Sequence, residues 1–407
     1  MTQNQTDAGR WRALTLLATA TVLAMATWFS ASAVVPQLRV RWELGPSAGA
    51  WLTIAVQIGF VIGAVVSALL TLPDRFPPRR VILGGALLAA AANLGLLAVD
   101  GVGGAIVLRA VTGAALAAVY PPGMKAMAAW FRRDRGLALG VMVGALTLGS
   151  ALPHLVNGLG GLSVEVVIIT TSLLTVGGGV LAQTVRPGPF PFPSAPFRPR
   201  QIFDVLRHRP TRLATLGYVG HMWELYALWA WIVVFLSRAF EKDAVTWQAA
   251  APLGAFAVIG IGALGCVAGG RIADRTTRER ATRISLATSG TSAALIGLTF
   301  GGPWWVVLAV ALVWGFWVVA DSAQFSTIVT EVADQRFVGT ALTVQTALGF
   351  ALTVITIWLI PVVERAVTWR WAFLLLVPGP IVGYLAMGRL ARLPAQASSD
   401  ASDVAAA

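Results

Sequence analysis

The sequence predicts an all-α integral membrane protein whose twelve transmembrane helices form two pseudo-symmetric six-helix bundles. Composition is the first reason: 57% of the 407 residues are hydrophobic and only 12% are charged, a balance far from that of a soluble globular domain. Apolar runs of about 20 residues, long enough to cross the hydrocarbon core of a bilayer as helices, recur along the chain. Short motifs also recur 200 positions later, for example Leu148-Gly149 as Leu348-Gly349, which indicates a duplicated half.

Twelve apolar runs, each bounded by charged residues, proline or glycine, are the predicted membrane spans. They cover residues 12–35, 48–72, 80–99, 102–125, 135–158, 164–185, 211–237, 248–270, 281–300, 304–330, 337–362 and 369–390. The predicted domains are a cytoplasmic N-terminal tail (1–11), an N-terminal bundle (12–185), a cytoplasmic linker (186–210), a C-terminal bundle (211–392) and a disordered tail (393–407). In the linker, the segment from Phe197 to Arg209 is either a short amphipathic helix on the inner leaflet or a disordered basic loop.

The positions of the basic residues orient the chain with both termini in the cytoplasm. In that orientation 23 of the 30 Lys and Arg residues fall at inner loops and six at outer loops, as the positive-inside rule requires. The N-terminal region resembles a cleavable signal peptide, with Arg10 and Arg12 before an apolar stretch and Ala31-Ser32-Ala33 after it. Cleavage there would remove the first span, so the two halves would no longer have matching sets of helices. We therefore expect a monomeric, multi-pass protein of the cell inner or plasma membrane.

The clearest repeated element is a short basic loop between the second and third spans of each half. Each copy carries Asp-Arg followed by further arginines, and the second copy begins with a glycine. This pattern resembles the signature loop of the major facilitator superfamily, a family of membrane transporters, and the resemblance covers about residues 10–392. It implies an inner-side latch formed in one access state by Asp74, Arg75, Gly270, Asp274, Arg275 and Arg278. The first copy departs from the family pattern, because Leu70 replaces the leading glycine and Pro77-Pro78 replace a further one.

Three ionisable residues lie inside predicted spans: Arg109, Glu224 and Asp321. A charge in the hydrocarbon core costs roughly 2.5–3.5 kcal/mol even on a lenient insertion scale, so such residues normally face a bundle interior or an aqueous cavity. They fall on the fourth, seventh and tenth spans, and the superfamily resemblance implies that these spans, together with the first, line a central cavity. Structural ion pairing away from any pathway is the alternative.

His221 lies three residues before Glu224 and therefore on the same helix face. A carboxyl between apolar walls loses hydration when it is charged, which favours its protonated form, and a histidine titrates near neutral pH. Arg109, with Gly113 four residues on, matches a fourth-helix Arg and Gly motif of the superfamily, in which the arginine is linked to proton coupling or cavity structure. The predicted substrate and proton pathway therefore consists of Arg109, His221, Glu224 and Asp321.

Other residues within the spans are assigned to packing. The glycines spaced for close helix approach are Gly59, Gly63, Gly140 and Gly144, since small residues let transmembrane helices come together. Packing or structural roles are also assigned to Trp223, Tyr226, Trp229 and His154.

Several function classes are excluded by the context of their motifs. Residues 45–49 fit the nucleophile-elbow pattern and residues 260–265 fit the dinucleotide fingerprint, but neither follows a predicted strand. The chain has no Gly-Lys-Ser/Thr phosphate loop and a single cysteine, Cys266, and its arginines are spread over short loops. No ATP site, metal, cofactor or nucleic-acid partner is therefore predicted, and the chain is not expected to be an enzyme.

The predicted function is secondary active transport of a small organic solute, coupled to protons, by alternating access of the two six-helix halves. An organic anion is favoured, because the stretch from Tyr120 to Gly136 is similar to organic-anion and nitrate-type symporters. A proton-driven efflux antiporter of drugs or metabolites is the first alternative, although Gly149-Ser150 and Pro153 replace the Gly-Pro pair of that group. A membrane sensor that binds a solute without transporting it is the second.

The predicted topology is testable by cysteine labelling. A cysteine introduced at Pro46 should react with an impermeant reagent from outside the cell, and one at Ser194 only from inside, because the arginine bias places the linker in the cytoplasm. The reverse pattern would overturn the helix count.

Overall fold

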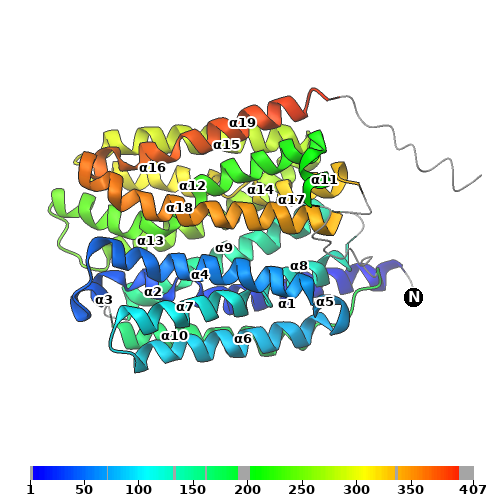
Figure 1. The fold of residues 1–407 in the computed structure, drawn as a ribbon, viewed down its shortest axis with the longest axis horizontal. Helices are drawn as coiled ribbons and strands as arrows, with labels where there is room; N and C mark the ends of the chain where they lie inside the picture. The colour runs from blue at the N-terminus through cyan, green and yellow to red at the C-terminus, as the bar shows by residue number, and fades with distance from the viewer. Residues whose placement is uncertain are drawn as a thin grey trace, which may run out of the picture.

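The computed structural model describes residues 3–70, 72–131, 134–160, 163–190, 202–334 and 338–393. Over these residues every regular element is a helix, and each of the predicted spans is largely helical. The helices run roughly along the long axis of the molecule, with α1–α10 in one half and α12–α19 in the other (Figure 1). This arrangement places the two sequence halves side by side.

The first half contains ten α-helices and two 3₁₀ turns over the described residues. They are α1 (Gln3–Ala24), η1 (Met25–Thr27), α2 (Ser30–Ala33), α3 (Val35–Arg41), α4 (Pro46–Leu69), α5 (Leu72–Arg75), α6 (Pro78–Leu94), η2 (Gly95–Ala98), α7 (Val102–Leu116), α8 (Tyr120–Ala128), α9 (Arg135–Leu159) and α10 (Val164–Ala182).

The linker and the second half follow the same plan. Their elements are α11 (Ile202–Arg207), α12 (Arg209–Lys242), α13 (Ala250–Gly260), α14 (Gly262–Arg275), α15 (Arg278–Thr299), α16 (Trp304–Trp317), α17 (Ser322–Val332), α18 (Val338–Ala372), η4 (Phe373–Leu376) and α19 (Pro378–Leu390).

Nine stretches of the described residues are long and apolar enough to cross a membrane. One of them, Val338–Leu390, holds both of the last two predicted spans, which meet at Thr368, where φ is 62° and ψ is 169°. The spans predicted at 12–35 and 281–300 fall outside this set. The first is broken after Ala24, and the second belongs to α15, which begins with the charged run Arg278-Glu279-Arg280.

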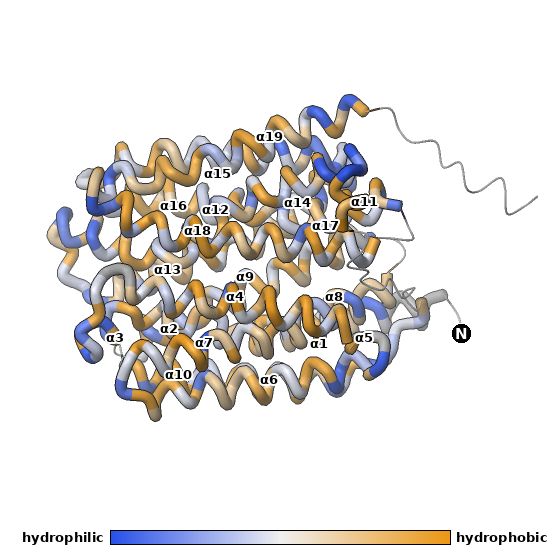
Figure 2. Tube along the Cα trace, viewed as in Figure 1, coloured by the Kyte–Doolittle hydropathy of each residue, from blue (hydrophilic) through white to orange (hydrophobic). Residues whose placement is uncertain are grey.

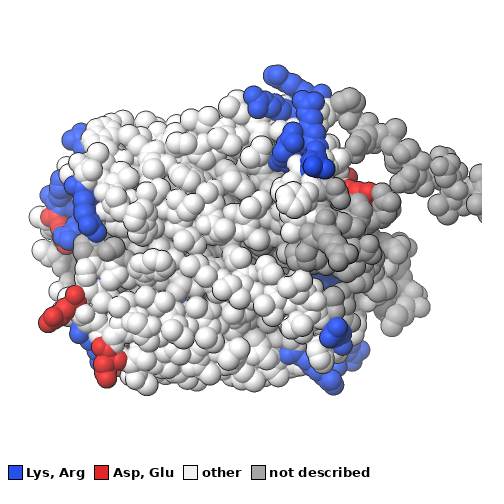
Figure 3. Space-filling model, in the orientation of Figure 1, with Lys and Arg blue, Asp and Glu red and all other residues white. Residues whose placement is uncertain are grey.

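Polar and apolar residues are segregated along the helix axes. Hydrophilic residues gather at the two ends of the helices, while the central band is mainly hydrophobic (Figure 2). The charged side chains on the face shown in Figure 3 also lie at the two ends, with none in the middle. This is the distribution expected when the central band contacts the hydrocarbon of a bilayer.

Several predicted spans contain breaks in the helix, and the breaks in the first and tenth spans lie next to candidate site residues. In the first span, Phe29 has φ −105° and ψ 17°, between η1 and α2. In the tenth span, α16 ends at Trp317 and α17 begins at Ser322, with Asp321 immediately before it. A break inside the apolar band leaves backbone groups without helical partners, so neighbouring groups must satisfy them.

Glycines bring neighbouring helices into backbone contact. Gly59 and Gly63 of α4 face the backbone of α7, and Gly113 of α7 faces the backbone of α4. A Cβ built at Gly63 would lie 2.5 Å from the carbonyl oxygen of Ala114, so a larger residue would force the helices apart. The packing role predicted for Gly59 and Gly63 agrees with this geometry.

The two halves meet where α9 packs against α13 and α14, and where α4 packs against α18. A Cβ built at Gly140 would lie 2.9 Å from the carbonyl oxygen of Cys266, so α9 and α14 approach closely. Among the hydrogen bonds between described side chains, one joins the halves, a 4.0 Å contact between Thr147 Oγ1 and Cys266 Sγ. The interface is therefore held mainly by apolar and small-residue packing.

Part of the linker is helical. Residues 191–201 and 394–407 lie outside the described residues, so the middle of the predicted linker and nearly all of the tail predicted to be disordered (393–407) are not described. In α11, Val205 is buried and Phe203 is 73% exposed. The helical alternative for the second part of the linker thus agrees with the structure over Ile202–Arg207.

Glycine packing gives a matched pair of substitutions. Gly113→Ala should lower the free energy of unfolding by about 1–3 kcal/mol, because its Cβ would collide with the backbone of α4. Gly177→Ala in α10 is the control, since its Cβ would meet nothing within 4 Å. The melting temperature of the purified protein measures both. Equal melting temperatures for the two variants would contradict the role given to Gly113.

Candidate functional site

Glu224 lies on α12 and is 1% exposed. Its Oε2 accepts a hydrogen bond from Ser289 Oγ of α15 at 2.9 Å, and its Oε1 accepts one from Trp314 Nε1 of α16 at 2.6 Å. Both donors are uncharged. The carboxyl group is thus held in place by neutral groups from two other helices of the same half.

His221 and Asp321 form a second buried group one helical turn away. Nδ1 of His221 lies 2.9 Å from Oδ1 of Asp321, and both side chains are 1% exposed. This is an ion-pair separation, yet neither carboxylate oxygen of Asp321 accepts a hydrogen bond of acceptable geometry from a described residue. The other ring nitrogen, Nε2, lies 2.6 Å from Ser322 Oγ. The break between α16 and α17 places Asp321 and Ser322 beside the ring.

These three ionisable side chains are all buried. A buried carboxylate is unfavourable unless it is paired or hydrogen-bonded, and Glu224 has two neutral donors but no cation among its hydrogen-bond partners. A protonated His221 would balance Asp321, whereas a neutral ring would leave that carboxylate uncompensated. The structure therefore brings together three of the four residues predicted for the pathway, namely His221, Glu224 and Asp321.

Arg109 is fully buried in α7 and has a different surrounding. Its Nη1 donates to the carbonyl oxygen of Thr27 at 2.9 Å and to Ser30 Oγ at 3.2 Å. Its Nη2 donates to the carbonyl oxygen of Trp28, and its Nε donates to that of Leu52 at 3.3 Å. Backbone acceptors of the broken first span and of α4 thus surround the guanidinium.

None of the hydrogen bonds of Arg109 goes to a carboxylate. Its remaining contact is a 3.5 Å approach to Asn93 Oδ1, and Asn93 in turn donates to the carbonyl oxygen of Ile168 and to Ser172 Oγ. These contacts connect the first, second, third, fourth and sixth predicted spans. Arg109 therefore connects several spans of the first half. These hydrogen bonds do not reach Glu224 of α12 or Asp321 of the tenth span.

The second copy of the basic loop contacts the other half. A Cβ built at Gly136, in the first turn of α9, would lie 2.6 Å from Oδ1 of Asp274. Asp134, which precedes α9, gives no side-chain cap, so the Asp274 carboxylate lies where a capping group would help. A carboxylate there is favoured by the free N–H groups and the dipole of the helix, by about 0.3–1 kcal/mol at an exposed site. Gly270 allows this approach, since its own Cβ would lie 3.3 Å from the Gly136 carbonyl oxygen.

The other predicted latch residues behave differently. Arg278 donates to both carboxylate oxygens of Glu331, at 2.8 and 3.0 Å, and to Gln324 Oε1 at 3.0 Å. These partners lie on α17, so Arg278 braces the second half internally. Arg75 and Arg275 are exposed. Asp74 belongs to α5, but its side chain lies outside the described residues.

An aromatic cluster that the sequence did not single out joins the two halves. Its members are Trp28, Phe29, Phe60, Tyr226, Trp229 and Phe350. Ring centroids lie 5.8 Å apart for Trp28 and Tyr226 and 5.9 Å apart for Phe29 and Trp229. Tyr226 and Trp229, which the sequence assigns to packing, make these ring contacts across the two halves. The available signal was their place on the same helix as Glu224, two and five residues further along.

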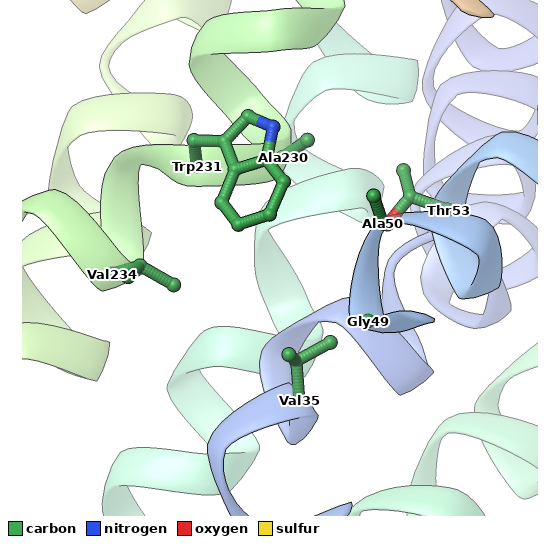
Figure 4. A pocket seen from close by; sticks show the side chains of 7 residues that line it. All are labelled: Val35, Gly49, Ala50, Thr53, Ala230, Trp231 and Val234. Carbon is green, nitrogen blue, oxygen red and sulfur yellow. The ribbon is translucent and has the colours of Figure 1, made fainter. Parts of the chain in front are cut away.

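A hollow lies next to this cluster. It is narrow, with a cavity volume of about 10 Å³, and is lined by Val35, Gly49, Ala50, Thr53, Ala230, Trp231 and Val234. These residues come from the first two spans of one half and from α12 of the other (Figure 4). Along α4, Thr53 precedes Gln57 by one turn, and along α12, Ala230 follows Tyr226 by one turn. Phe60 of the cluster follows Thr53 by seven residues, so the hollow is about two turns from the cluster along α4 and about one turn along α12.

Comparison with known proteins agrees with this architecture. The family model of the Major Facilitator Superfamily matches residues 17–357, which include both halves of the chain. No curated protein sequence shows a significant match to the chain.

The contact of Asp274 with α9 predicts how the inner side opens. Asp274→Asn removes the charge that the α9 N-terminus favours, so the separation of α9 from α14 should become easier. Cys266, the single cysteine, is buried at that contact and reports on it directly. Its rate of modification by a permeant maleimide should rise about two- to fivefold.

The matched control for this experiment is Arg275→Gln, which changes the neighbouring exposed charge. It should leave the modification rate of Cys266 as in the unaltered protein. If Asp274→Asn also leaves that rate unchanged, the carboxylate does not hold the inner side closed.

Proposed function

The chain belongs to the major facilitator superfamily of secondary transporters, which bind small-molecule substrates within a lipid bilayer, and from this premise we propose that it couples solute transport to protons through Glu224. The observation that carries the proposal is the surrounding of this carboxyl group. It is buried, and within the described part of the chain its hydrogen-bond donors are the neutral Ser289 and Trp314. Loading a proton removes a charge that the apolar interior disfavours.

His221 and Asp321 form the second proton site of the proposal. The 2.9 Å separation of their facing atoms suits a pair in which the imidazolium offsets the carboxylate. Loss of the histidine proton leaves a buried charge without its partner, which is unfavourable. The pair and Glu224 are thus two coupled groups whose protonation states depend on each other.

Alternating access would change the exposure of these groups to water but would leave their hydrogen-bond partners the same. Ser289, Trp314, Asp321 and Ser322 all lie in the same half as Glu224 and His221. A rocking motion of one half against the other therefore preserves these contacts. It would expose the carboxyl to one side of the membrane at a time, which makes proton loading and release dependent on the access state.

The proposed substrate is a small organic anion that moves together with a proton. Proton-driven efflux by antiport remains the alternative, because it uses the same carboxyl chemistry and differs in the side on which the solute is loaded. The proposal includes a monomeric transporter of the plasma membrane with both termini in the cytoplasm. It assigns Arg109 a structural part, since backbone carbonyls receive its hydrogen bonds.

Glu224→Gln tests the coupling. The variant keeps a hydrogen-bonding side chain but cannot exchange a proton, so accumulation driven by a pH gradient in proteoliposomes should be lost. Exchange of labelled for unlabelled solute should persist, because exchange needs no net proton movement. The solute is one that stabilises the purified protein in a thermal-shift screen of organic acids, amines and sugars.

The control for this experiment is Glu241→Gln, which removes an exposed carboxylate near the outer end of the same helix, α12. It should leave accumulation intact. Full accumulation by Glu224→Gln, with Asp321→Asn equally active, would remove both residues from the mechanism.

A further inference from the structure

Arg283 of α15 lies against α19 and keeps hydrogen-bond donors free. Its Nη2 donates to Tyr384 Oη of α19 at 2.6 Å, and its Cζ lies 4.3 Å from the centroid of the Tyr384 ring. A guanidinium has five N–H donors, and its Nε has no hydrogen-bond partner among the described residues. Arg283 is therefore held in place by Tyr384 while further donors await an acceptor.

The two helices run antiparallel, which places the start of α15 beside the end of α19. A Cβ built at Gly388 would lie 3.6 Å from Arg283 Nε, and one built at Gly290 would lie 2.8 Å from Cβ of Pro380. Since Gly388 has no side chain, the guanidinium can lie against α19. Both helices lie at the edge of the second half that is farthest from the first half (Figure 1).

Positive charge gathers where α15 begins and α19 ends. Arg280, Arg389 and Arg392 are exposed there, beside the partly exposed Arg283. Glu279 is the acidic residue of these two stretches, and none of the four arginines forms an ion pair with a carboxylate in the described part of the chain. Lys and Arg side chains also gather at this end of the molecule in Figure 3. The group therefore favours an anion.

An exposed apolar stripe on α19 leads to these arginines. Ile381, Leu385 and Arg389 are exposed and follow one another at intervals of four residues, so they lie on one face of the helix. Ile284 of α15 is exposed as well. A molecule that lies along this face meets apolar side chains in the central band and positive charge at its end.

The planar guanidinium selects the anionic group. Its N–H donors match the oxygen atoms of a phosphate, to which arginine can donate two parallel hydrogen bonds. Basic clusters between membrane helices bind the head groups of anionic lipids. A phosphate attached to acyl chains satisfies both the free donors and the apolar stripe, whereas a free phosphate ion satisfies the donors alone.

We infer that the adjoining ends of α15 and α19 form a binding site for an anionic phospholipid, with Arg283 as the fixed donor to its phosphate. Arg280, Arg389 and Arg392 add positive charge around the head group, and an acyl chain lies along Ile381 and Leu385. The site is specific to the second half, because the residue 200 positions before Arg283 is Leu83. It lies on the outer surface of the bundle and does not depend on the proposed proton coupling.

Native mass spectrometry of the purified full-length protein tests the ligand class. Phosphatidylglycerol should bind about tenfold more tightly than phosphatidylcholine with the same acyl chains, because the four arginines favour a net negative charge. Inorganic phosphate in large excess should not displace the bound phosphatidylglycerol. Equal binding of the two lipids, or displacement by inorganic phosphate, would overturn the inference.

Substitutions of Arg283 locate the site. Arg283→Gln should weaken phosphatidylglycerol binding about tenfold, because it removes hydrogen bonds to a charged group. Arg283→Lys keeps the charge but loses the planar fork, so it should weaken binding about threefold. The control is Arg80→Gln, which removes an exposed arginine near the start of α6, 200 positions before Arg280. It should bind as the unaltered protein does.

Equal weakening by Arg80→Gln and Arg283→Gln would show attraction by overall charge and would overturn the site. A further variant, Arg392→Gln, changes an exposed side chain and leaves the contact of Arg283 with Tyr384 in place. It should keep the melting temperature of the unaltered protein and weaken phosphatidylglycerol binding about two- to threefold. Unaltered binding by Arg392→Gln or by Arg283→Gln would contradict the inference, even if the other variant failed to fold.

Discussion

The hydrogen bonds of Arg109 to the broken first span are the interaction on which the first half depends. Inside a bilayer, a helix break exposes carbonyl oxygens that water cannot reach. Arg109 supplies donors to Thr27, Trp28 and Leu52, so a buried charge and a set of unpaired acceptors satisfy each other. The break in turn directs Trp28 and Phe29 toward the second half, where they meet Tyr226 and Trp229.

Hydrogen bonds hold each half together internally, whereas the contacts between the halves are mainly apolar. Within the halves, Asn93 connects three spans, and Arg278 braces α15 against α17. Between the halves, the described contacts are ring packing, glycine packing, the 4.0 Å contact of Thr147 Oγ1 with Cys266 Sγ and the approach of Asp274 to α9. Since apolar contacts are not directional, such an interface can separate and re-form while each half keeps its internal hydrogen bonds.

The sequence was sufficient for the family and for the all-α membrane fold, and both predictions are confirmed by the family match over residues 17–357. The repeat supplied them, because Asp274 and Asp74 mark equivalent places in the two halves. Proximity of His221 to Glu224 also followed from helix spacing. Contacts that depend on tertiary packing did not follow from the sequence. No local pattern indicates that Arg278 contacts Glu331 within its own half, or that Trp28 and Trp229 each pack against rings of the other half.

The central claim is that two internally bonded halves move against each other as units. Double electron–electron resonance distances test it directly, with spin labels at Arg75 and Arg275, which are exposed on the loops of opposite halves, in a Cys266→Ser background. The account predicts at least two distances whose populations shift with pH, while a pair at Arg275 and Arg280 within one half keeps a single distance. One unchanging distance between the halves in an actively transporting protein would contradict it.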